Sequence, residues 1–207
     1  MANAALRMTG LKPFVQPGDR VRFNYYRVNT AASLFRFQPV AQNNSGQVQI
    51  ATIGDLSPIL GTILGFVATT QDALPGNLID LAQNAFLDSS VNALAAVSDD
   101  PNQLYIMEAD TGGTAIDSEN SSGGTVTWTY MATTGNTTTG VSQALLDRST
   151  WVFGTGGQLQ LIRPYREYVN EDGTLNDVTL DNEKWIVRIY WHQRNNSDAN
   201  ILTRWPT

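Results

Sequence analysis

Four carboxylates in the middle of the chain come closest to a catalytic pattern. Asp99 and Asp100 are consecutive and precede Pro101, while Glu108 and Asp110 follow the next predicted strand. Paired carboxylates can act as the acid and the base of a glycosidase, or they can bind a hard cation. Asp followed by Pro is also a common way to begin a turn. We therefore interpret Asp99, Asp100 and Pro101 as a turn.

Three other motifs share only part of the pattern of a functional site. His192 is the only histidine, and no Gly-x-Ser-x-Gly elbow or nearby Ser/Asp pattern accompanies it. Gly154–Gly157 lacks the Lys-Ser/Thr ending of a phosphate-binding loop. The loop that begins at Asn170 has Leu175 and Asp181 where an EF-hand calcium loop requires Gly and Glu. We interpret all three motifs as structural, and we predict no enzymatic activity, no cofactor and no metal site.

The composition excludes further classes of function. The chain has no cysteine, so it has no disulfide framework, no thiolate nucleophile and no Cys-ligated metal. Its first residues contain no secretory h-region, and no run of about 18 apolar residues could span a bilayer. We therefore expect neither a signal peptide nor a membrane partner. Charged residues are only 15% of the chain, which suits either a threonine-rich β protein or surfaces that partners cover.

Charge is strongly segregated along the chain. No Lys, Arg or His lies between Arg36 and Arg148, and this acidic stretch holds eleven carboxylates. Residues 1–36 instead contain six basic residues and one acidic residue. An acidic body repels phosphates, so we expect no nucleic-acid partner. Because arginine favours bidentate pairing with carboxylates, we interpret the basic segment as a contact surface between subunits.

Short apolar runs and period-two alternation dominate the chain and predict strands. Polar, glycine-rich loops separate these runs, which favours a mainly β fold, either a β-barrel or a β-sandwich. In the first strand Val21, Phe23 and Tyr25 alternate with polar residues, which predicts one apolar face. Residues 77–87 fit a short helix or a loop leading into a strand, and we favour the helix. The predicted strands span residues 20–27, 33–40, 59–68, 125–131, 159–162 and 185–191.

We predict one domain at residues 19–193, with an extended N-terminal arm at residues 1–18 and a C-terminal tail at residues 194–207. Deleting residues 1–18 is expected to leave a folded domain that no longer binds its partner. Trp205 beside Arg204 is either a docking hot spot or folds back onto the domain. The predicted contact residues are Arg7, Lys12, Phe14, Arg20, Arg22, Arg204 and Trp205.

A series of short motifs runs through most of the predicted domain. In chain order they are Tyr26–Val28, Ala32–Val40, Ile63–Val67, Val97–Pro101, Leu104–Glu108, Thr137–Ser142, Leu146–Thr150, Leu159–Ile162, Asn170–Glu171 and Trp185–Gln193. Through these motifs and their order, the chain resembles the head decoration (cement) proteins of tailed bacteriophages. The resemblance extends over roughly residues 20–193.

The resemblance implies a β-rich virion protein that binds the outer surface of the phage head. The implied partners are the major capsid protein and further copies of the same chain, with a homotrimer favoured. The implied role is to stabilise the expanded shell against the pressure of the packaged DNA, and no catalytic residues come with it. Two alternatives stay open: a receptor- or carbohydrate-binding virion module, and a hydrolase that uses Asp99, Asp100 or Glu108.

Overall fold

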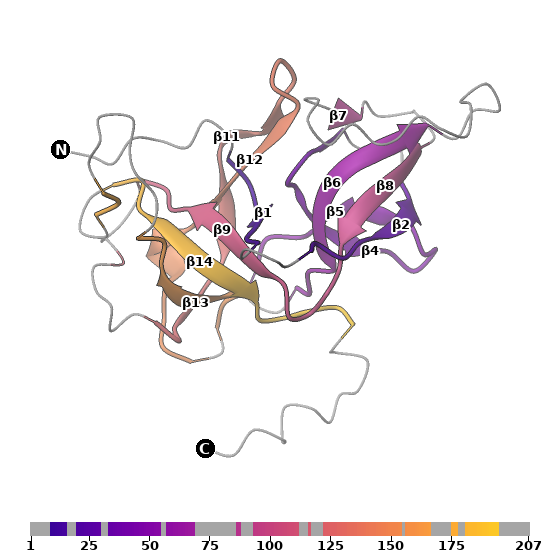
Figure 1. Ribbon diagram of the computed structural model, residues 1–207. Coiled ribbons are helices and arrows are strands. Elements are labelled where there is room, and N and C mark those ends of the chain that lie inside the picture. The colour runs from indigo at the N-terminus through magenta and orange to yellow at the C-terminus, as the bar shows by residue number, and fades with distance from the viewer. Residues whose placement is uncertain are drawn as a thin grey trace.

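The chain forms antiparallel β-sheets in a β-sandwich-like arrangement (Figure 1). The predicted mainly β class is confirmed, and the sheets of the described residues do not close into a barrel. No helix in this part of the chain is long and apolar enough to cross a membrane. The computed structural model describes residues 9–15, 20–29, 33–54, 57–68, 86–87, 93–111, 116, 122–154, 156–166, 175–177 and 181–194.

The first five-stranded sheet lies on the left of Figure 1 and contains the last strand of the described chain at its centre. Trp185, Val187 and Ile189 of that strand are buried in the main hydrophobic core, as the alternation predicted. Trp128 and Met107 pack into the same core from other strands. In spatial order the sheet consists of β1 (Lys12–Pro13), β9 (Leu104–Glu108), β14 (Lys184–Ile189), β13 (Leu159–Pro164) and β10 (Thr125–Val126).

The second five-stranded sheet lies on the right of Figure 1 and has its own core. An isolated bridge between Val28 and Val48 brings its two outer strands together at one end. Gly61 lets two strands approach closely, because an added Cβ would lie 1.9 Å from the carbonyl oxygen of Ser98. In spatial order the sheet consists of β2 (Asn24–Arg27), β8 (Ala93–Ser98), β6 (Gly61–Ala68), β4 (Pro39–Gln42) and β5 (Val48–Ile50).

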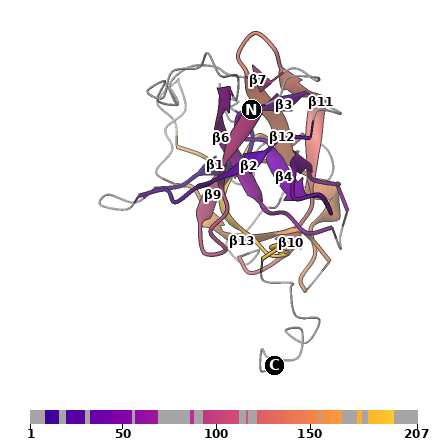
Figure 2. The ribbon, with the colours of Figure 1, turned by 90° about the vertical axis from the view of Figure 1, so that its right-hand side faces the viewer.

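Two two-stranded sheets accompany these five-stranded sheets. The hairpin of β11 (Trp128–Asn136) and β12 (Val141–Leu146) lies beside β3 (Leu34–Phe35) and β7 (Phe86–Leu87), as Figure 2 shows from the right-hand side. Gly135 permits this contact, since a Cβ there would lie 2.2 Å from the ring of Phe35. The hairpin leads into the 3-10 turn η2 (Arg148–Thr150), and the side chain of Asp147 caps this turn.

The predicted helix at residues 77–87 is wrong at its end. Phe86 and Leu87 form a strand that pairs with Leu34 and Phe35, so pairing with a distant strand overrides the helical spacing of the sequence. The rest of the predicted helix lies outside the described residues.

Residues 9–15, which were predicted to be part of a free arm, belong to the first sheet. Leu11 is fully buried in its core, and its N–H donates to the carbonyl of Phe37 at 2.9 Å. Lys12 and Pro13 pair with β9. The burial of Leu11 and this strand pairing together hold the segment in place. The remainder of the predicted arm, at residues 1–8 and 16–18, lies outside the described residues.

Candidate functional site

Residues 20–27 form a positively charged surface that we call the basic edge. Arg20, Arg22 and Arg27 are exposed along it. None of the described residues forms a salt bridge with these three guanidinium groups. The contact role predicted for Arg20 and Arg22 stays a prediction, and both side chains are exposed.

The apolar residues of the basic edge are exposed as well, which corrects the predicted alternation. Phe23 and Tyr25 are 41% and 53% exposed, and their rings meet edge to face with centroids 5.6 Å apart. Val21 is half-buried against the small cluster that contains Phe37, and Tyr26 is half-buried against the core of the second sheet. Within the regular strand, which begins at Asn24, Tyr26 therefore faces the core and Tyr25 faces away from it.

The strand of the basic edge has one open side. Its order in the sheet gives β2 a single neighbour, β8. The N–H of Val28 donates to Ala93 at 3.2 Å, so the even-numbered residues of β2 point their backbone groups toward β8. By the same alternation, the N–H groups of Tyr25 and Arg27 point away from β8. Among the described residues, this side is covered past the end of β2, where the N–H of Asn29 donates to the carbonyl of Val48 at 2.8 Å.

The other predicted contact residues are placed differently. Lys12 lies half-buried on β1, an edge strand of the first sheet. Phe14 is also half-buried, and it packs edge to face on Tyr165 at 5.8 Å with the guanidinium of Arg163 over its ring at 6.0 Å. Phe14 therefore stabilises its own sheet. Three further predicted contact residues lie outside the described residues: Arg7, Arg204 and Trp205.

Asp99, which the sequence singled out, anchors three segments of the chain. It is 2% exposed, and both carboxylate oxygens accept from the Asn24 amide at 3.0 Å. The hydroxyl of Tyr26 donates to it, and Arg194 forms an ion pair with it at 2.5 Å. Burial, reinforced by the hydrogen bond to this carboxylate, raises the pKa of Tyr26 to about 12. The hydrogen-bond donors of the Asp99 carboxylate thus come from the same chain. This arrangement suits a residue that links the segments of Tyr26 and Arg194 to its own.

Asp100 and His192 have structural surroundings. The Asp100 carboxylate accepts from the N–H of Asn102 at 2.9 Å, as expected for the predicted turn. His192 is fully buried, and burial lowers its pKa to about 4. Its Nδ1 accepts from the N–H of Arg194 at 3.1 Å. The backbone of His192 also forms an isolated β-bridge with Ile59, which precedes β6 of the second sheet. The neutral, buried imidazole therefore helps to hold the end of the described chain in place.

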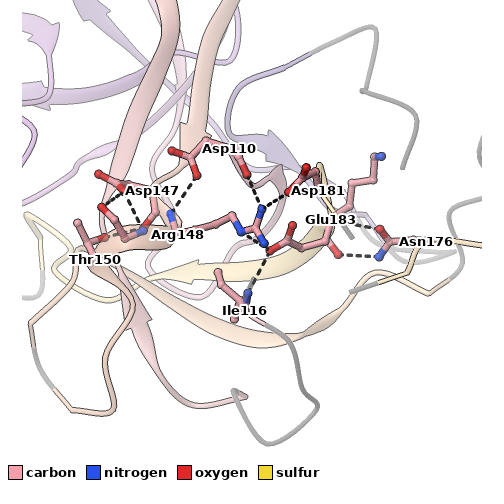
Figure 3. Close-up of polar contacts among 10 residues, drawn as sticks. Asp110, Ile116, Asp147, Arg148, Thr150, Asn176, Asp181 and Glu183 are labelled. Atoms are coloured by element: carbon pink, nitrogen blue, oxygen red, sulfur yellow. Dashed lines mark hydrogen bonds and ion pairs between the residues drawn. The ribbon is translucent and has the colours of Figure 1, made fainter. Parts of the chain in front are cut away.

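A buried charge network that the sequence did not reveal lies at the end of the first sheet (Figure 3). Arg148 is only 5% exposed, and its guanidinium lies 2.7 Å from Asp181 and 3.4 Å from Glu183. The same guanidinium donates to the carbonyl of Asp110 at 3.3 Å, and the backbone N–H of Arg148 donates to the Asp110 carboxylate at 3.2 Å. The network joins η2 to the segments that follow β9 and precede β14.

Burial perturbs two neighbouring groups of this network. The pKa of Glu183 rises to about 7, chiefly because its carboxyl is removed from water. The adjacent Lys184 is fully buried with its ammonium 3.8 Å from Glu108, and burial lowers its pKa. Glu183 and Lys184 directly precede the apolar run that begins at Trp185. This position in the sequence could have predicted that they are buried. Their partners come from distant positions that the sequence does not connect.

The remaining motifs do not assemble into a site among the described residues. Gly154 has a φ of +122°, a left-handed conformation that suits a turn. The start of the calcium-like loop at Asn170 lies outside the described residues, while Asp181 pairs with Arg148. No group of three or more His, Cys, Asp or Glu side chains in the described ranges is arranged to hold a metal ion.

The described structure therefore offers one accessible charged surface with exposed aromatics, the basic edge, and two buried polar clusters whose groups pair within the chain. Comparisons of the chain with protein-family models, curated proteins and solved structures found no match.

Proposed function

We propose that this chain is a structural virion protein that decorates the outer surface of a tailed-phage head and stabilises the expanded shell. The order of its sequence motifs carries the resemblance on which the proposal rests. The observation on the structure that supports it is the contrast between buried, internally paired carboxylates and an exposed edge of aromatics and of arginines that form no salt bridge with the described residues. Such an edge suits contact with another protein, because arginine and aromatic residues are enriched at interface hot spots.

The proposed mechanism is cohesion by many modest contacts. A stable interface buries about 1,000 Å² or more, and several linked copies hold more firmly than one without any new kind of contact. An acidic, rigid β body would stay on the outside of a shell whose interior holds DNA, because like charges repel. The partner in this proposal is the major capsid protein.

Co-sedimentation with phage heads tests the proposal. The purified full-length protein should pellet with expanded heads of the phage that encodes it and stay in the supernatant with unexpanded heads. Absence of binding to both forms at saturating protein would refute the proposal. Binding to a panel of glycans in place of heads would support the receptor- or carbohydrate-binding alternative.

The predicted arm requires a modified deletion. Removing residues 1–18 would remove Leu11 from the core and β1 from the sheet, so loss of binding would not distinguish an arm from misfolding. Removing residues 1–8 keeps both. Under the arm hypothesis this shorter deletion still abolishes head binding while the protein stays folded, as thermal unfolding would show. Full decoration by the shortened protein would exclude residues 1–8 as the arm that binds heads.

A further inference from the structure

We propose that the open side of β2 takes up an extended, acidic segment of a partner protein as an additional strand. The identity of the partner rests on the proposed function, under which the segment belongs to the major capsid protein. The contact depends on the backbone of β2 and on the side chains of the basic edge, and both are present in the purified protein alone.

The backbone of β2 offers hydrogen-bonding groups along its open side. The N–H groups of Tyr25 and Arg27 point away from β8, and neither donates to a described residue outside that strand pair. A strand edge of this kind pairs with another extended chain, because backbone N–H and C=O groups form hydrogen bonds wherever a partner lies within reach. The open stretch is short, since the bridge between Val28 and Val48 brings β5 against the end of β2. It therefore suits a segment of a few residues.

The two residues whose N–H groups point outward also share one face of the strand. Tyr25 is 53% exposed and Arg27 is exposed as well, whereas Tyr26 between them faces the core of the second sheet. Residues of an added strand would lie opposite Tyr25 and Arg27 on that same face. There, a carboxylate opposite Arg27 gains an ion pair, and an apolar side chain opposite Tyr25 packs on its ring. The edge thus favours a segment in which an acidic and an apolar residue are two positions apart.

The charge of the edge decides what kind of molecule fits it. Residues 20–27 include three arginines and no carboxylate, and none of these arginines forms a salt bridge with the described residues. The buried carboxylate of Asp99 pairs with Arg194 instead. An acidic chain therefore gains charge pairs here, whereas a second β2 would bring arginines against arginines. A nucleic acid would offer phosphates to the arginines without a backbone that continues the β ladder, and the acidic body would repel it.

Binding of a synthetic peptide tests the contact. The fluorescent probe has threonine at every second position, with glutamate and valine alternating between the threonines. Anisotropy should show saturable binding that weakens as salt rises, because ions screen the charge pairs. Arg27→Glu should raise the dissociation constant by about tenfold or more. The matched control is Arg166→Glu, which reverses an exposed arginine after β13 of the other sheet and should leave binding unchanged.

Two substitutions at Tyr25 test whether the backbone makes the contact. Tyr25→Pro and Tyr25→Ser both remove the ring, but only proline also removes the N–H that points away from β8. Proline is tolerated on an edge strand when its N–H is not part of the ladder, and thermal unfolding should show that both variants fold. Tyr25→Pro should then bind the peptide about tenfold more weakly than Tyr25→Ser. Hydrogen exchange of the unaltered protein should show that bound peptide protects the N–H groups of Tyr25 and Arg27.

Several results would overturn the inference. These are absence of peptide binding at millimolar concentration, equal binding by the two folded Tyr25 variants, and preference for a peptide with lysine in place of glutamate or for a single-stranded oligonucleotide. Protection of the Tyr25 and Arg27 N–H groups without peptide would also overturn it, since the chain or a second copy would then already cover the edge.

Failure of this inference is distinguishable from failure of the proposed function. Co-sedimentation with expanded heads in the absence of any peptide binding would leave the proposed function standing and would overturn the added strand. Specific peptide binding by a protein that ignores heads would support the added strand and would refute the proposed function.

Discussion

The basic edge and the Arg148 network use the same kind of side chain in opposite ways. The arginines at residues 20–27 are exposed and form no salt bridge within the described structure, whereas Arg148 is buried among carboxylates. Removing one partner of a buried ion pair leaves the other charge buried without a counter-charge, which destabilises the fold. Changing a neighbour of an exposed guanidinium changes the stability little, because water solvates the charge. The comparison teaches that the network stabilises the fold and that the edge is free to serve contacts with other molecules.

The largest expected effect is at Arg148. Replacing it in Arg148→Met should reduce the free energy of unfolding by about 3–5 kcal/mol, because Asp181 and Glu183 lose their buried counter-charge. Urea-induced unfolding measures this change. Arg22→Met, the matched control at the basic edge, should change stability by less than about 0.5 kcal/mol. Equal losses for the two variants would remove the distinction between the regions.

A smaller but pH-dependent effect is expected at Glu183. Because the folded protein raises the pKa of Glu183 from 4.5 to about 7, the folded state holds this proton more tightly than the unfolded state does. The resulting stability is fully present below pH 4.5 and is lost as the pH rises to about 7. Its size is on the order of 3 kcal/mol.

Glu183→Gln isolates this contribution, since the variant has no proton to lose at that position. Subtracting its unfolding free energy from that of the unaltered protein at each pH cancels the other titrating groups. The difference should fall between pH 4.5 and about 7 and stay level at higher pH. A difference that is independent of pH would show that burial does not perturb Glu183.

Asp99 and Asp100 provide a pair of neighbours for the next prediction. Asp99→Ala should reduce the free energy of unfolding by about 2 kcal/mol, because it removes a buried carboxylate that accepts hydrogen bonds from Asn24 and Tyr26. Asp100→Ala should cost about 0.5–1 kcal/mol, since it removes a single hydrogen bond within a turn. Thermal or urea unfolding of both variants gives the ranking, and a reversed ranking would contradict the assignment of Asp99 as the anchor.

The smallest stability effect is expected at the tip of the basic edge. Tyr25→Ser removes an exposed ring that contacts Phe23, so the free energy of unfolding should change by no more than about 0.5 kcal/mol. Under the proposed function, the same variant should weaken co-sedimentation with expanded heads. A stability loss of several kcal/mol would show that the ring belongs to the fold and is not reserved for a partner.

The sequence predicted the mainly β class and the face of β14 that carries Trp185, Val187 and Ile189, because residues two positions apart on a strand share a face. It did not predict that Ile186, on the other face, is buried as well. The same rule failed at Phe23 and Tyr25, since alternation indicates two faces without showing that a second layer covers either of them. The helical spacing of residues 77–87 was misleading at Phe86 and Leu87, which form a strand that pairs with Leu34 and Phe35.

Part of the polar organisation was beyond reach of the sequence for a related reason. Asp99 was recognised as notable, yet its partners Tyr26 and Arg194 lie 73 and 95 positions away along the chain. The partners of Arg148 are separated from it by 33 and 35 positions. Spacing rules connect residues on one helix, strand or loop, so they do not identify ion pairs that tertiary folding creates.

The central position of β14 has a consequence for synthesis on the ribosome. All strands of the second sheet lie between residues 24 and 98, so that sheet can assemble while later residues are still being added. In the first sheet β9 and β13 meet only through β14, which leaves the ribosome more than 170 residues after β1. Long-range pairing of this kind is slow to form. A polypeptide cut short before Lys184 would keep one assembled half and leave β9 and β13 with unsatisfied edges prone to aggregation.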